Sequence, residues 1–86
     1  MKIIKIGAMW CPACLIMNKR LKEIEQKYNI EVISYDYDLD EDIVNKYQVG
    51  EVLPELIFTD NNNEEIKRLI GEQLIDNIIS IIESGC

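Results

Sequence analysis

Apolar residues in the first part of the chain form short runs and one-sided stripes, which predict strands and helices in alternation. Two runs rich in β-branched residues predict buried strands at residues 2–8 and 32–37. Between them, apolar residues recur at the helical steps of four, three and four, at Met17, Leu21, Ile24 and Tyr28. We therefore expect a helix over about residues 12–28, ended by Asn29.

A short helix is expected after the second strand. Asp38 and Asp40 are both good N-cap residues for it, because their side chains can accept a hydrogen bond from a free N–H of the first turn. Its apolar side is formed by Ile43, Val44 and Tyr47. Gly50 is expected to close it.

The C-terminal part predicts a hairpin and a last helix. Residues 56–59 and 65–70 have strand character, and the Asp-Asn-Asn-Asn run at 60–63 predicts the turn between them, because both residue types tolerate left-handed backbone. Gly71 ends the hairpin. A stripe of isoleucine and leucine then predicts a helix over about 73–83.

The element order is thus β-α-β-α-β-β-α, which indicates an α/β protein with one domain over residues 1–86. The first two strands are joined through a helix, so we expect them to be parallel neighbours with a right-handed crossover. The tight turn makes the last two strands antiparallel. The whole is expected to be a four-stranded mixed sheet flanked by helices on both faces.

Charge and composition exclude several function classes. Sixteen acidic against nine basic residues give a net charge of −7, so nucleic acid and anionic membrane surfaces would repel the chain. The absence of histidine excludes Cys-His and Ser-His catalysis and every zinc site that contains histidine. Neither a secretory signal nor a membrane span is visible. We expect a cytoplasmic monomer without a prosthetic group or metal.

The three cysteines carry the candidate chemistry. Cys11 and Cys14 form a Cys-Pro-Ala-Cys unit at the predicted strand-to-helix junction, whereas Cys86 is the last residue and is expected to be dispensable. The free N–H groups and the dipole of a helix N-terminus favour a thiolate at Cys11, and Pro12 suits the first turn. Cys14 lies one helical turn further on. This spacing predicts that Cys11 is the exposed attacking thiol and Cys14 the inner, resolving thiol.

The segment Trp10-Cys11-Pro12-Ala13-Cys14 resembles the Trp-Cys-x-x-Cys active site of thioredoxins. The segment from Val52 to Phe58 is similar to their cis-proline segment, and Gly71 falls where they have a glycine before the last helix. The resemblance implies a thioredoxin fold and a thiol–disulfide oxidoreductase of the thioredoxin or glutaredoxin type.

The resemblance also implies roles for particular residues. Cys11 and Cys14 would form the redox-active disulfide. Trp10, Pro12, Leu53 and Pro54 would contact the substrate, with Pro54 in the cis form. The implied partners are protein disulfides as substrates and a flavoprotein similar to thioredoxin reductase as electron donor.

Lys5 is the clearest departure from the thioredoxin pattern, because thioredoxins carry a buried acid at that position. A nearby ammonium group would favour the Cys11 thiolate by opposite-charge attraction, which makes Lys5 a candidate for tuning the thiol pKa values and the reduction potential. The alternative is that Lys5 extends to solvent from the end of a strand and has no role.

Two other functions stay open. Proline after the first cysteine is typical of glutaredoxins, which depend on glutathione, but their glutathione motifs are poorly matched here, and Glu51 and Glu55 beside Pro54 are expected to repel that anionic tripeptide. Met9 begins a Met-x-Cys-x-x-Cys sequence, which resembles the soft-metal loop of heavy-metal-associated domains for copper or zinc. That family should end in a strand, whereas this chain is expected to end in a helix.

Overall fold

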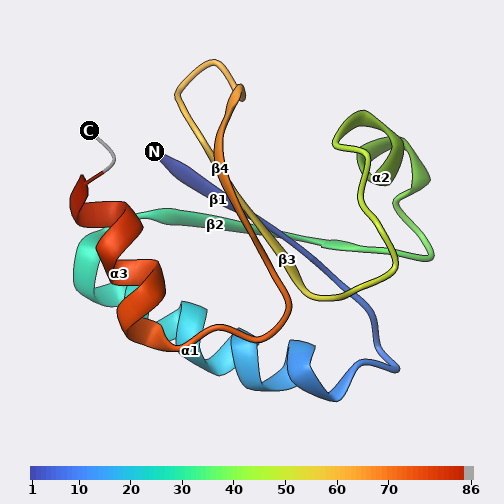
Figure 1. The fold of residues 1–86 in the computed structure, drawn as a ribbon, viewed down its shortest axis with the longest axis horizontal. Helices are drawn as coiled ribbons and strands as arrows, with labels where there is room; N and C mark the ends of the chain where they lie inside the picture. The colour runs from blue at the N-terminus through green and yellow to red at the C-terminus, as the bar shows by residue number, and fades with distance from the viewer. Residues whose placement is uncertain (85–86) are drawn as a thin grey trace.

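A computed structural model of the chain describes residues 1–84 and contains the seven predicted elements in the predicted order (Figure 1). Their bounds are β1 Lys2–Gly7, α1 Pro12–Tyr28, β2 Glu31–Asp36, α2 Glu41–Lys46, β3 Glu55–Thr59, β4 Glu65–Ile70 and α3 Ile75–Ser84. The predicted bounds differ from these by two residues or fewer, apart from α2, for which candidate N-cap residues, an apolar side and a closing Gly50 were predicted rather than bounds. Cys86 lies outside the described residues.

Helix α1 has the bounds that its sequence predicts, because both ends have residues suited to a helix terminus. Pro12 occupies the first helical turn, where its missing N–H costs no hydrogen bond. Asn29 follows the last turn in the left-handed conformation, with φ of 54°. The helix therefore begins directly after Cys11, which is its N-cap residue.

Helix α2 ends differently from the prediction. It stops at Lys46, and the left-handed residue that follows is Gln48, with φ of 52°, rather than Gly50. At its start Asp40 is the N-cap residue, but its carboxylate does not cap the helix. It accepts a hydrogen bond from the backbone N–H of Asp36 at 2.7 Å and so joins the helix to the end of β2.

The sheet has the strand order β2-β1-β3-β4. The strand β1 is parallel to β2 and antiparallel to β3, and β3 is antiparallel to β4, as expected. The two central strands are therefore β1 and β3, and nearly all of their residues are buried. The chain segments that follow β1 and precede β3 lead to Cys11 and Pro54, so the most buried part of the fold supports both.

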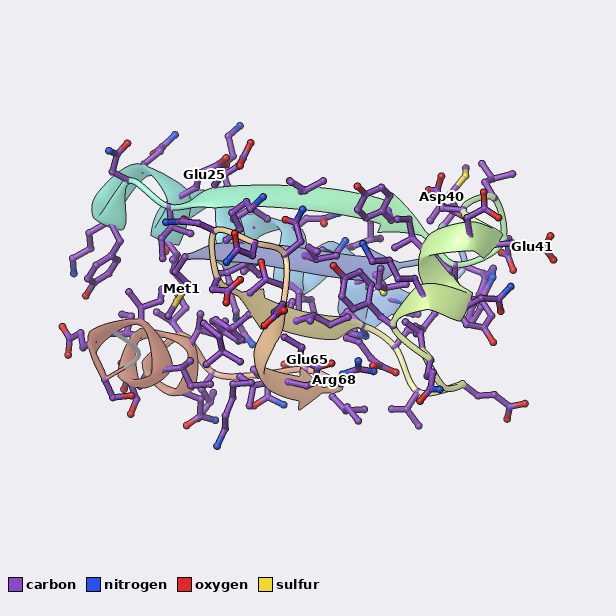
Figure 2. All side chains as sticks on the ribbon, turned by 90° about the horizontal axis from the view of Figure 1, so that it is seen from above. Met1, Glu25, Asp40, Glu41, Glu65 and Arg68 are labelled. Atoms are coloured by element: carbon purple, nitrogen blue, oxygen red, sulfur yellow. The ribbon has the colours of Figure 1, made fainter. Side chains whose placement is uncertain are left out.

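Helices cover both faces of the sheet. Residues of α1 and α3 pack with Ile3, Leu56 and Phe58, which lie on one face. Residues of α2 and its flanking loops pack with Ile4 and Ile57 on the other face. Helices α2 and α3 lie toward opposite ends of the sheet (Figures 1 and 2). Within residues 1–84, none of the helices has the length and apolarity needed to cross a membrane.

Candidate active site

Cys11 is the N-cap residue of α1, and its sulfur has a backbone hydrogen-bond partner on each side. Its Sγ accepts a hydrogen bond from the backbone N–H of Cys14 at 3.3 Å. Its thiol in turn donates to the backbone carbonyl of Leu53 at 3.7 Å. Cys11 is only 6% exposed, so the prediction of an exposed thiol is wrong. The segment that contains Leu53 lies against the sulfur and accounts for this burial.

Cys14 is the more deeply buried of the two cysteines, at 2% exposure, and both are free thiols. Burial raises the pKa of Cys14 to about 11, and a hydrogen bond with the Cys11 side chain acts in the same direction. The charge of Lys5 lowers the Cys14 pKa, but by less. Cys14 therefore keeps its proton at neutral pH in the reduced protein. This agrees with a thiol that acts second.

The Leu53–Pro54 peptide bond is cis, as the resemblance implies. Leu53 and Pro54 are both buried, and the Pro54 carbonyl accepts a hydrogen bond from the N–H of Gly71 at 2.8 Å. Leu53 therefore meets Cys11 both through its backbone carbonyl and within one buried apolar cluster. The neighbouring Val52, which the sequence analysis did not single out, is 61% exposed.

The surface around Cys11 carries large exposed apolar side chains. Trp10 is 61% exposed and Met9 is 88% exposed, so neither packs in the core. The indole N–H of Trp10 donates to the Asp38 carboxylate at 2.8 Å, an anchor that sequence reasoning missed. Pro12 is also exposed. The exposed side chains of Met9, Trp10 and Pro12 form an apolar rim beside the Cys11 sulfur. This apolar rim provides a contact area next to a reactive sulfur.

Lys5 is buried, at 6% exposure, and so does not extend to solvent from the end of a strand. Its ammonium group donates a hydrogen bond to the side-chain oxygen of Asn18 on α1, a partner that was not predicted. Burial lowers the pKa of Lys5, whereas negative charge on Cys14, and then on Cys11, raises it. The Lys5 cation thus lies within the electrostatic range of both cysteines.

Glu55 does not lie on the surface, which corrects one part of the argument against glutathione. It is 2% exposed, and its carboxylate accepts hydrogen bonds from the Gly50 N–H and from the Arg68 guanidinium, both at 2.9 Å. Arg68 also donates to the Tyr47 carbonyl at 2.6 Å. The negative charge of Glu55 is therefore neutralised inside the protein. A repulsive charge beside Pro54 remains only at the exposed Glu51.

The comparisons with known proteins agree with this geometry. The family model described as Thioredoxin matches residues 1–84. The chain belongs to the thioredoxin family. Thioredoxin H7 of Arabidopsis thaliana is 33% identical over 82 residues, a match that covers 94% of this chain and 61% of that protein. This thioredoxin-family chain therefore spans less than two thirds of the length of that curated relative.

Solved structures confirm the thioredoxin fold. Thioredoxin 1 from Thermosipho africanus superposes with a TM-score of 0.88 at 25% identity, covering 99% of this chain and 93% of that one. Reduced Schistosoma mansoni thioredoxin superposes with a TM-score of 0.85 at 24% identity, covering 95% and 75%. The described elements have one strand between the first two helices and superpose on thioredoxins, whereas a heavy-metal-associated domain has the order β-α-β-β-α-β. The fold therefore disfavours the metal-module alternative suggested by Met9.

Proposed function

We propose that this thioredoxin-family protein reduces, or exchanges, disulfide bonds of protein substrates through the dithiol of Cys11 and Cys14. The observation that carries the proposal is the placement of Cys11 at the N-terminus of α1. There its sulfur accepts a hydrogen bond from the backbone N–H of Cys14 at 3.3 Å. A hydrogen bond from a backbone N–H stabilises a thiolate, which is the form that attacks disulfides. The apolar rim beside it suits an unfolded or loop segment of a substrate protein.

In the proposed first step, the Cys11 thiolate attacks one sulfur of a substrate disulfide. A bond forms between Cys11 and that sulfur, the substrate disulfide breaks, and the other substrate sulfur leaves as a thiolate with the electron pair. The backbone of Leu53 lies against the Cys11 sulfur. We propose that this backbone pairs with an extended segment of the substrate, in the manner of a strand added to a sheet edge.

In the second step, Cys14 loses its proton and attacks the Cys11 sulfur. The mixed disulfide breaks, the second substrate sulfur leaves as a thiolate, and a Cys11–Cys14 disulfide forms, so that two electrons pass to the substrate. An external reductant must then restore the dithiol. We propose a flavoprotein similar to thioredoxin reductase as that donor, and a reducing compartment such as the cytoplasm as the site of action.

Trapping of the mixed disulfide tests the proposal and the two roles. Cys14→Ser should accumulate a covalent complex with a disulfide substrate such as insulin, because the resolving thiol is gone. Cys11→Ser should accumulate none and should lose the reduction of insulin. Cys86→Ser is the control and should turn over like the wild type. Equal trapping by the Cys11 and Cys14 variants would contradict the assignment.

A glutathione-dependent activity is the second candidate function. The ion pair of Glu55 with Arg68 inside the protein supports it, because this carboxylate no longer counts against the binding of glutathione. The burial of this carboxylate removes one of the two negative charges that were expected to repel glutathione at Pro54. Recycling of the oxidised protein distinguishes the candidates. We expect thioredoxin reductase to restore the dithiol faster than glutathione with glutathione reductase, because the glutathione motifs of glutaredoxins are poorly matched. The opposite order would assign the protein to the glutaredoxin type.

A further inference from the structure

Lys5 is a buried cation that forms no ion pair with a carboxylate within residues 1–84. It lies in the central strand β1, where residues alternate between the two faces of the sheet, and so it shares the α1-covered face with Ile3. Its ammonium group donates a hydrogen bond to the neutral amide of Asn18. Buried lysines are rare unless they are paired, because removing a cation from water is costly. A buried charge of this kind suggests a partner anion that forms only transiently.

The position of Gly7 shows that the Cys14 sulfur lies close to this charge. A side-chain Cβ at Gly7 would lie 3.0 Å from Lys5 Nζ and 3.1 Å from Cys14 Sγ, so the two atoms are no more than about 6 Å apart. At that separation opposite charges affect one another strongly. Among the described residues whose charge acts on Lys5, Cys14 has a larger effect than Cys11. The ammonium group therefore lies on the side of the resolving thiol.

We propose that Lys5 is a positioning residue for the second half of the reaction, in which its ammonium group stabilises the thiolate that Cys14 must form to resolve the mixed disulfide. This inference rests on the proposed oxidoreductase function. In the mixed disulfide, the Cys11 sulfur is covalently bonded and carries no charge. The main obstacle to ionisation of Cys14 is then its burial, which a cation no more than about 6 Å away opposes.

The proton that Cys14 loses has a route to solvent. An open cleft of about 550 Å³ lies between the start of α1 and the end of β2, and both Cys14 and Lys5 line it. The Cys14 proton passes to water in this cleft, the Cys14 thiolate bonds to the Cys11 sulfur, and the substrate sulfur leaves with the electron pair. Gly7 also lines the cleft, and its lack of a side chain keeps the space between the two groups open.

The other charged groups around Lys5 do not replace it. Asp36 and Asp40 line the same cleft, but both carboxylates accept hydrogen bonds from backbone N–H groups of their own loop. As anions, they cannot stabilise a thiolate. Lys22 and Glu25 line the adjoining cleft further along α1, and both are exposed. Lys5 is therefore the buried cation available to Cys14 within residues 1–84.

A rapid-mixing experiment separates the two half-reactions. The reduced protein is mixed with Ellman's reagent, a small aromatic disulfide whose thiolate absorbs visible light. The attack of Cys11 releases the first thiolate at a rate proportional to reagent concentration, and resolution by Cys14 releases the second at a rate independent of it. In Lys5→Met we expect the first phase to change little, because the charge of Lys5 is coupled more weakly to Cys11 than to Cys14. The second phase should be about tenfold slower at neutral pH, with its pH profile moved upward by about one unit.

Two further variants make the test specific. Lys22→Met removes a cation from the neighbouring cleft and should change neither phase. Gly7→Ala keeps the Lys5 charge but places a methyl group 3.0 Å from Nζ and 3.1 Å from Sγ, so that the ammonium group must shift away from its position beside Cys14. It should slow the second phase alone, and it serves as the test if Lys5→Met does not fold. An unchanged second phase, or an equal slowing of both phases, would overturn the proposal. Absence of the first phase in the wild type would instead overturn the proposed function.

Discussion

The pairing of Glu55 with Arg68 offers the sharpest test of how the fold supports the site. Arg68 on β4 donates to the Glu55 carboxylate at 2.9 Å, to the Tyr47 carbonyl at 2.6 Å and to both oxygens of Glu65. Glu65 and Arg68 lie together on β4 (Figure 2). This network fixes the chain between Tyr47 and Glu55, which includes Leu53 and its contact with Cys11. Its removal should therefore destabilise the protein and loosen the site.

Replacing Arg68 by Met keeps the aliphatic stem but leaves the Glu55 carboxylate, at 2% exposure, without its cation. Breaking a buried ion pair from one side costs about 3–5 kcal/mol. The side chain of Arg68 is 19% exposed, so water reaches the broken pair and we expect the lower end of that range. A loss of about 3 kcal/mol is large against the roughly 5–15 kcal/mol that stabilises a domain. In a protein of this size it lowers Tm by about 12 °C or more.

The assay is urea unfolding of the reduced protein, followed by far-ultraviolet circular dichroism. The expected result is a lower midpoint with an unchanged slope. Glu65→Gln is the matched control, since its carboxylate is 37% exposed and such pairs contribute about 1 kcal/mol or less. The double variant Arg68→Met with Glu55→Gln should recover part of the loss, because the amide oxygen still accepts the Gly50 N–H and the buried charge is gone. Equal, small losses for Arg68→Met and Glu65→Gln would refute the reasoning.

Two other predictions follow from the buried ionisable groups. Because burial raises the pKa of Cys14 to about 11, the ¹³Cβ chemical shift of Cys14 in the reduced protein should remain thiol-like until the pH approaches that value; a transition near pH 8 would contradict this. Burial lowers the pKa of Lys5 below 10.5, so the folded state binds this proton less tightly than the unfolded chain does, and the charge costs stability at neutral pH. Lys5→Met should accordingly be more stable than the wild type by about 1–2 kcal/mol at pH 7, with a gain that shrinks as the pH rises toward 10.5. A destabilised variant, or a gain that does not depend on pH, would mean that the lysine charge is not the cause.

Much of the fold was predictable from local sequence. The bounds of α1 follow from Pro12 at its start and Asn29 at its end, because both residues have backbone preferences that act without tertiary contacts. The order of the elements then allowed only a few sheet topologies. A helical connection between β1 and β2 requires these strands to be parallel, and the tight turn between β3 and β4 requires those strands to be antiparallel. The candidate dithiol was also visible, because its chemistry depends on a spacing of three residues within one helical turn.

The tertiary structure decided the environment of each functional group. The sequence could not reveal that Glu55 is buried against Arg68, that Asp38 anchors Trp10, or that Cys11 is covered by Leu53, because these partners are between 13 and 42 residues apart. The same holds for Lys5. The sequence shows a lysine at this position, but it does not show whether the ammonium group lies in solvent or near the cysteines. Burial and pairing of a charge depend on which distant segments meet, and these determine whether a carboxylate repels a ligand or a lysine stabilises a thiolate.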